Sequence, residues 1–104
     1  MRRGEVWWAH LPAPAGRRPV VLLSRDDAYA VRELVIVAPV TTRIRHIPVE
    51  VPLGKGEGLS RRCVANLDTV TTIPKALLVE YAGALDVAKM ADLDRAARFA
   101  LGLD

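Results

Sequence analysis

Few side chains in this sequence could build a chemical site: one cysteine, two histidines and fifteen Lys or Arg. It has no phosphate-binding glycine motif, no histidine spacing typical of a metal site and no nucleophile elbow around a serine. Cys63 stands in an apolar segment, which predicts a buried core thiol and not a nucleophile. Histidine is the side chain best suited to proton transfer near neutral pH, and the sequence has two, His10 and His46, either of which can also be a solvated surface residue.

Basic residues are concentrated in the first part of the chain. Residues 1–62 hold eleven Lys or Arg against six Asp or Glu, whereas residues 63–104 hold four against six, so the net charge is +5 and −2 respectively. Clustered arginines on one side of a small protein suit a polyanion or an acidic peptide. A basic solvated surface would give the same composition. Successive side chains of a strand point to opposite faces, so one of the adjacent Trp7 and Trp8 is expected in the core. The other can stack on a base or fill a subunit interface.

The length and composition indicate a single domain at residues 1–104, because 104 residues form one core only if nearly every element contributes to it. The apolar runs are strand-sized, and the charged N-terminal residues lack the long apolar region of a secretory signal. We therefore expect a cytoplasmic protein without a membrane span. A single cysteine gives neither an internal disulfide nor a zinc site, so a small core is expected to gain support from oligomerisation.

Most of the chain is patterned for short β-strands. Strands are predicted at Glu5–Leu11, Val20–Leu23, Leu34–Val40, Pro48–Leu53, Cys63–Ile73 and Leu78–Ala82. Proline and glycine predict a loop at Ala13–Arg18 and a flexible turn at Gly54–Gly58, and Pro74–Leu77 is predicted to form one helical turn. Strands this short favour a strongly curved antiparallel sheet, close to a small barrel.

The end of the chain is patterned as one helix. Asp86 is a suitable N-cap and Gly102 is placed to end the helix. An apolar stripe at helical spacing is expected to pack on the sheet, and it consists of Met90, Leu93, Ala97, Ala100 and Leu101. The sequence therefore predicts a mainly β fold with a C-terminal helix.

Five segments along nearly the whole chain carry a family resemblance. They are Gly4–Trp7, Arg18–Leu22, Val37–Thr42, Asn66–Ile73 and the helix end at Leu101–Leu103. Together they resemble the MazF/PemK family of toxin endoribonucleases, whose fold the CcdB-type toxins share. The resemblance implies a small SH3-like curved antiparallel β-barrel, a homodimer, and a cognate antitoxin with an acidic disordered segment. It also implies sequence-selective cutting of single-stranded RNA, without a metal or cofactor, by 2′-OH attack that leaves a 2′,3′-cyclic phosphate.

The same resemblance places the catalytic residues. Arg18 precedes the proline that opens the second strand and matches the family's catalytic arginine, and Thr41 matches its catalytic threonine. A planar guanidinium can bind the charge that gathers on a phosphate in the transition state, and a hydroxyl can donate to the same oxygens. Because a guanidinium stays protonated near neutral pH, another group is expected to move the proton. His46 is the candidate and Asp68 the alternative, and either can equally be structural.

Further polar residues are expected to bind RNA. Phosphate contacts are expected from Arg17, Arg43 and Arg45, and contacts to base edges from Asn66, Asp68 and Thr69. Thr42 is also expected to bind RNA. The first loop, with only Ala13–Arg17, is shorter than in many family members and lacks the acidic residue found there. A transfer RNA is therefore as reasonable a substrate as a messenger RNA.

Two other functions stay open at the level of sequence. The CcdB-type toxins bind DNA gyrase and do not cut RNA, and such a toxin has no need to keep Arg18 and Thr41 together. The third possibility is a plain SH3-like binding module. The basic first half and the lack of an aromatic peptide groove argue against it.

Overall fold

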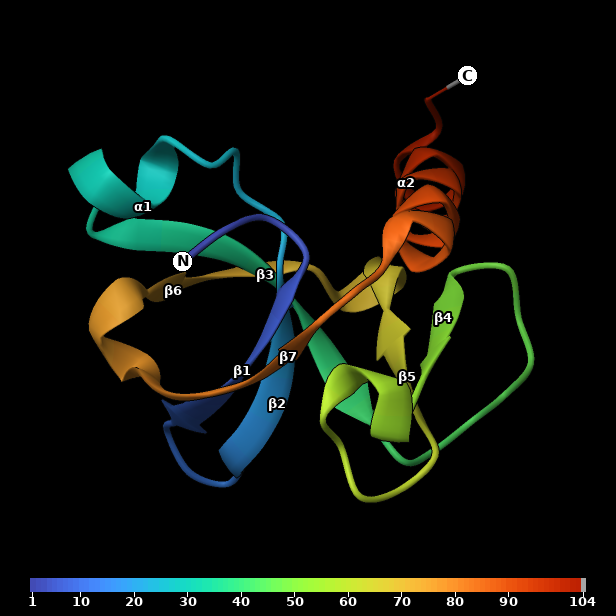
Figure 1. Cartoon of the computed structure of the whole chain (residues 1–104), viewed down its shortest axis with the longest axis horizontal. Helices are drawn as coiled ribbons and strands as arrows, with labels where there is room; N and C mark the ends of the chain where they lie inside the picture. Colours follow the sequence, from blue (N-terminus) through green and yellow to red (C-terminus); the bar gives the residue numbers. More distant parts are fainter. Residues whose placement is uncertain (104) are drawn as a thin grey trace.

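A computed structural model describes residues 1–103 as a curled antiparallel sheet with one long helix packed on it (Figure 1). The strands are β1 (Glu5–Leu11), β2 (Gly16–Leu22), β3 (Leu34–Thr41), β4 (Glu50–Leu53), β5 (Cys63–Asn66), β6 (Thr71–Pro74) and β7 (Leu78–Ala84). The helices are α1 (Ala28–Val31) and α2 (Val87–Leu101), with 3-10 turns η1 (Lys55–Glu57), η2 (Leu67–Thr69) and η3 (Lys75–Leu77). The strand order is β4-β5-β3-β2-β1-β7, and β6 also pairs with β3.

The sheet bends along β3, which has different partners at its two ends. Its first half, Leu34–Val37, pairs with β6, whereas Val40 and Thr41 pair with β5. The change of partner divides the buried side chains into two clusters: Val35 and Val37 belong to one and Val40 to the other. The predicted mainly β fold is therefore confirmed, in the form of a half-barrel whose two ends are β4 and β7.

Helix α2 covers the β4 end of the sheet, as the sequence predicts. The Asp86 carboxylate caps it by accepting the N–H of Lys89 (2.8 Å), and Gly102 ends it with φ +70. Leu93 is fully buried against β4 and η2. Leu101 was expected in the same stripe, but it is 62% exposed because the last turn of α2 extends past the sheet (Figure 1). Neither helix in the described residues has the length and apolar run that crossing a membrane requires.

Two of the expected elements are wrong in detail. Gly16–Arg18 was assigned to a loop, but backbone pairing with Ala9–Leu11 makes it the start of β2. The single strand expected at Cys63–Ile73 is interrupted by η2, because Asn66 Oδ1 accepts the N–H of Asp68 (2.8 Å) and turns the chain. The turn predicted at Gly54–Gly58 is present and contains η1. The short helix α1 was not expected, and the predicted turn before β7 is present as η3.

The turn η1 packs with its backbone directly on the backbone of β7. A Cβ atom added at Gly83 would lie 2.4 Å from the carbonyl oxygen of Glu57. A Cβ added at Gly58, which has φ +82, would lie 1.9 Å from the carbonyl oxygen of Ala82. These distances exclude any side chain, so the two glycines allow the segment after η1 to lie close to the sheet.

A buried carboxylate shapes the loop between β3 and β4. Glu50 is only 6% exposed, and its carboxylate accepts the backbone N–H groups of Arg45 (3.0 Å) and His46 (2.9 Å). His46 has φ +57, in the left-handed region that few residues other than glycine adopt. The loop therefore holds a defined shape without regular secondary structure, and Glu50 is a structural residue that local sequence patterns do not reveal.

Replacing Gly83 tests the close contact between η1 and β7. We expect Gly83→Ala to lower the free energy of unfolding by about 1–3 kcal/mol, because the added methyl must push two backbones apart. Gly56→Ala is the matched control in η1, since nothing lies within 4 Å of a Cβ there. Urea unfolding of both variants gives the comparison. Equal stabilities would show that the contact does not constrain the fold.

Replacing Glu50 tests the loop anchor. Glu50→Gln keeps the size of the side chain but turns one of the two oxygens that accept the N–H of Arg45 into a donor facing that N–H, which is expected to cost about 1–3 kcal/mol. Hydrogen exchange at the Arg45 and His46 amides should become faster. Glu33→Gln, on an exposed residue, removes the same charge and should leave this exchange unchanged. Unaltered exchange in the Glu50 variant would contradict the anchoring role.

Candidate functional site

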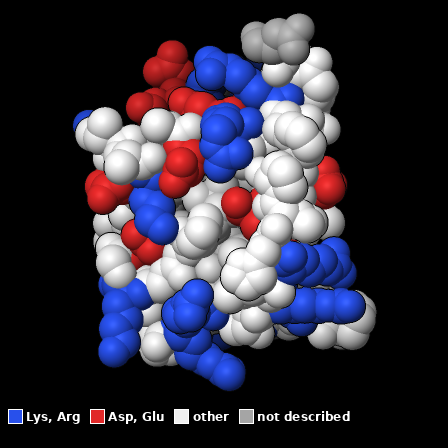
Figure 2. Space-filling view, turned by 90° about the vertical axis from the view of Figure 1, so that its right-hand side faces the viewer, with Lys and Arg blue, Asp and Glu red and all other residues white. Residues whose placement is uncertain are grey.

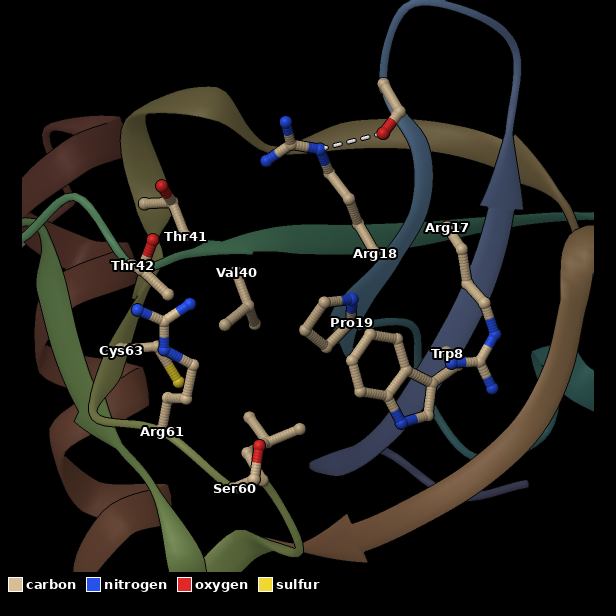
Figure 3. A pocket seen from close by; sticks show the side chains of 12 residues that line it. Trp8, Arg17, Arg18, Pro19, Val40, Thr41, Thr42, Ser60, Arg61 and Cys63 are labelled. Carbon is tan, nitrogen blue, oxygen red and sulfur yellow. Dashed lines mark hydrogen bonds between the residues drawn. The ribbon is translucent and has the colours of Figure 1, made fainter.

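Two pockets meet where β2 begins and β3 ends. The first has a volume of about 310 Å³ and is lined mainly by Trp8, Arg17, Arg18, Pro19, Val40, Thr41, Thr42, Ser60 and Arg61 (Figure 3). The second has a volume of about 220 Å³ and is lined by Arg18, Pro39, Val40, Thr41, Arg43, Arg45, Asn66 and Thr69. Arg18 and Thr41 line both pockets, so they form part of a wall that the two pockets share.

The pairing of β2 with β3 brings these two residues together. Val20 lies opposite Pro39 in the antiparallel register, and continuing this register by two residues along each strand sets Arg18 across from Thr41. Figure 3 shows both side chains at the same rim of the first pocket. The predicted catalytic pair is therefore adjacent in space, although it is separated by more than twenty positions in the chain.

The side chain of Arg18 is held by one of its three nitrogens. Its Nε donates to the carbonyl oxygen of Ala15 (3.0 Å), in the short turn between β1 and β2 (Figure 3). No protein acceptor in the part of the chain that the structure describes binds its two Nη atoms. Arg18 is exposed, so these atoms offer two parallel donors to a phosphate or carboxylate entering the pockets.

Thr41 is oriented by the chain that follows it. The backbone N–H of Arg43 donates to Thr41 Oγ1 (3.1 Å). Because that contact uses the hydroxyl oxygen as an acceptor, the hydroxyl hydrogen is left to donate elsewhere. The shared wall thus presents hydrogen-bond donors from both residues, with a positive charge on one of them.

Most of the residues expected to bind RNA line these pockets. Thr42 lies in the first, and the second contains Arg43, Arg45, Asn66 and Thr69. Asp68 is exposed on η2 and is absent from both linings. Arg17 lines the first pocket, but its guanidinium is paired with Glu80 and lies over the ring of Trp8, 4.5 Å from its centroid.

The structure does not bring His46 to Arg18 and Thr41. His46 lines a third pocket of about 210 Å³ on the β4–β5 side, together with Arg62 and the buried Glu50. His10 is exposed on β1 and lines neither of the first two pockets. Among the residues described, those two pockets contain no imidazole and no carboxylate, and their polar side chains carry guanidinium, hydroxyl and amide groups besides the thiol of Cys63 in the first pocket.

Cys63 is a core residue, as predicted. It is 5% exposed, and its Sγ lies 3.7 Å from the carbonyl oxygen of Leu53. Burial raises the pKa of the Cys63 thiol, with a smaller contribution from the nearby Glu57, so the thiol stays protonated and is a poor nucleophile. Within residues 1–103 no three His, Cys, Asp or Glu side chains gather as metal ligands would.

Two residues of the first pocket were missed from sequence. Ser60 and Arg61 follow η1, and the glycine contact with β7 brings them to the pocket. The available signal was the basic pair Arg61-Arg62 after a glycine-rich turn. Figure 2 shows Lys and Arg gathered along one end of the molecule, with the Asp and Glu of that face lying above them. The pockets thus belong to a molecule with a marked basic end.

Comparison with known proteins identifies the family of this chain. Residues 2–101 match the family of PemK-like, MazF-like toxins of type II toxin–antitoxin systems. The probable endoribonuclease MazF5 of Mycobacterium tuberculosis is 48% identical over 84 residues, which cover 80% of this chain and 76% of that protein. The endoribonuclease MazF9 of the same organism is 33% identical and covers 99% and 98% of the two chains.

The solved structures show the same fold. The Mycobacterium tuberculosis toxin MazF-mt6 has a TM-score of 0.89 and 32% identity, with 96% of this chain and 98% of that chain covered. A mycobacterial endoribonuclease in complex with its cognate antitoxin has a TM-score of 0.86 and 28% identity, with coverage of 100% and 97%. Relatives named as endoribonucleases do not favour the gyrase-binding alternative. The chain belongs to the PemK-like, MazF-like toxin family of type II toxin–antitoxin systems.

Proposed function

We propose that this chain is the toxin of a type II toxin–antitoxin system and cuts single-stranded RNA at Arg18 and Thr41 without a metal ion. The observation that carries the proposal is the shared wall, where donors of both residues stand between two pockets. An RNA strand crossing this wall would place its scissile phosphate on Arg18 and Thr41. The nucleotides before and after that phosphate would enter the two pockets.

The proposed reaction is a transesterification within the RNA. The ribose 2′-oxygen attacks the neighbouring phosphorus, the bond to the 5′-oxygen breaks, and a 2′,3′-cyclic phosphate and a 5′-hydroxyl are formed. Negative charge increases on the non-bridging oxygens in the transition state, where the two Nη atoms of Arg18 bind them and the Thr41 hydroxyl adds a donor. Both residues are oriented before substrate arrives, by Ala15 and by the N–H of Arg43.

The proton transfers are assigned to water in this proposal. The 2′-hydroxyl must lose a proton and the leaving 5′-oxygen must gain one, and neither pocket has an imidazole or carboxylate among its described lining residues. His46 lies in the third pocket and Asp68 on the outside of η2. The open site lets water reach the reacting atoms, and Arg18 remains a cation throughout.

The second pocket supplies the RNA contacts on one side of the cut. Arg43 and Arg45 carry positive charge for backbone phosphates, and the Glu50 carboxylate fixes the loop that bears them. Asn66 and Thr69 are the groups in this pocket that can bind base edges of unpaired nucleotides.

The partners we propose follow from charge and exposed apolar surface. The basic pockets suit the acidic disordered segment of a cognate antitoxin, and an antitoxin is bound in the mycobacterial structure described above. Exposed apolar residues on β3 and β7, such as Leu34, Val79 and Tyr81, support a homodimer. We place the toxin in the cytoplasm, where its RNA substrates are, acting as one domain.

Substitutions of the shared wall test the activity and its site. Purified chain incubated with single-stranded RNA in EDTA should yield fragments ending in a 2′,3′-cyclic phosphate. Arg18→Ala and Thr41→Val should each lower the cleavage rate by about 10²-fold or more, because each removes a donor to the transition state. Thr41→Ser, which keeps the hydroxyl, should retain most of the activity.

Two control variants sharpen this test. Arg32→Ala removes an exposed arginine at the end of α1 and should cleave like the parent. His46→Asn, which uses a residue that tolerates positive φ, should also keep the parent rate if water moves the protons. Cleavage by the Arg18 and Thr41 variants at the parent rate would refute the site. No cleavage by the parent, with DNA gyrase inhibited instead, would refute the function.

A further inference from the structure

Three neighbouring strands bring Arg17, Trp8 and Glu80 together beside the first pocket. Trp8 on β1 lies opposite Glu80 on β7 and, on the other side, opposite Pro19 on β2. Arg17 is two residues before Pro19, so its side chain is on the same face of the sheet as Trp8. The guanidinium of Arg17 crosses the Trp8 ring at 4.5 Å from its centroid and forms an ion pair with Glu80. Trp8 and Arg17 both line the pocket, as Figure 3 shows.

This arrangement occupies two groups that RNA could use. A guanidinium that is held by a carboxylate and lies over a ring has fewer donors and less freedom to bind a phosphate, and an indole ring covered by a guanidinium has one face closed to a base. The side chains of Arg17 and Glu80 are 48% and 61% exposed. An exposed ion pair is weak, and a phosphate can therefore replace its carboxylate.

We propose that Glu80 competes with RNA for Arg17, and that RNA binding moves Arg17 to a backbone phosphate and opens the face of Trp8 to a nucleobase. The inference rests on the proposed function for the identity of the ligand. It assigns Trp8 as a stacking position for one unpaired nucleotide of the strand that crosses Arg18. Glu80 is then a residue that lowers RNA affinity, although it bears no reacting group.

The chemistry of the exchange is balanced in charge. Arg17 leaves one anionic partner, the Glu80 carboxylate, and gains another, a phosphate, while Glu80 becomes solvated. Base stacking on the uncovered ring adds a contact that does not depend on which base is present, since every base has a flat face. The free energy of stacking thus favours the open arrangement only when single-stranded nucleic acid is bound.

Binding of a 2′-O-methyl RNA tests the exchange without cleavage, because its 2′-oxygen cannot attack. Glu80→Gln is expected to tighten binding roughly two- to fivefold, the range of an exposed ion pair. Glu33→Gln, an exposed carboxylate outside the pocket linings, is the control for net charge. If Glu80→Gln and Glu33→Gln bind the 2′-O-methyl RNA with equal affinity, Glu80 does not compete specifically with RNA and the proposal fails.

A double-mutant cycle shows whether the gain passes through Arg17. Arg17→Ala should weaken binding and reduce the slope of log K against log salt concentration by about 0.7, the value for one phosphate of a single strand. In the Arg17→Ala background, Glu80→Gln should then bring no gain beyond that of Glu33→Gln. An equal gain from Glu80→Gln with and without Arg17 would overturn the proposal.

The emission of Trp8 reports the stacking. In a Trp7→Phe variant Trp8 is the only tryptophan, and the 2′-O-methyl RNA should change its emission as a base replaces the guanidinium. Unchanged emission at saturating RNA would overturn the stacking role. Cleavage of unmodified RNA by the parent chain, measured in parallel, separates the two proposals. If the parent does not cleave RNA but the Glu80 and Arg17 variants change binding as expected, only the catalytic proposal is refuted.

Discussion

The pairing of β3 with different strands at its two ends is the constraint on which the rest of the molecule depends. β3 pairs with β6 along its first half and with β5 at its end, and the buried side chains on either side of this change of partner belong to two separate clusters. The bend lies close to the end of β3, and it carries Thr41 to the surface between two hollows. The same strand also fixes Arg18, through its register with β2.

Segments without regular secondary structure are fixed by contacts with the backbone. Glu50 holds two N–H groups of the loop after β3, and Gly58 with Gly83 lets the chain after η1 touch β7. In both places the contact is made with backbone atoms, so it does not depend on which side chains the loop presents to the pockets. The residues that these loops contribute to the pockets can therefore vary in type while the backbone around the site keeps its shape.

Local patterns in the sequence were sufficient for most elements. Alternation and apolar runs located β1, β3 and β7, and a capping aspartate with a terminal glycine gave both ends of α2. They failed where a distant partner decides: Gly16–Arg18 has loop composition, yet pairing with β1 makes it a strand. The role of Glu50 also depends on burial that only the folded chain creates. The pair Arg18 and Thr41 came from a family resemblance, and no spacing rule would have joined it to Ser60 and Arg61.

The shared wall at Arg18 and Thr41 has a consequence for the shape of any polymer that spans it. Adjacent nucleotides of a duplex stay stacked at a fixed separation and face a partner strand, whereas two pockets divided by a wall need neighbouring bases turned apart. Only a chain free to bend sharply at one phosphodiester can satisfy both pockets at once. The wall would therefore select flexible, unpaired regions such as loops and strand ends over helical regions, whatever their base sequence.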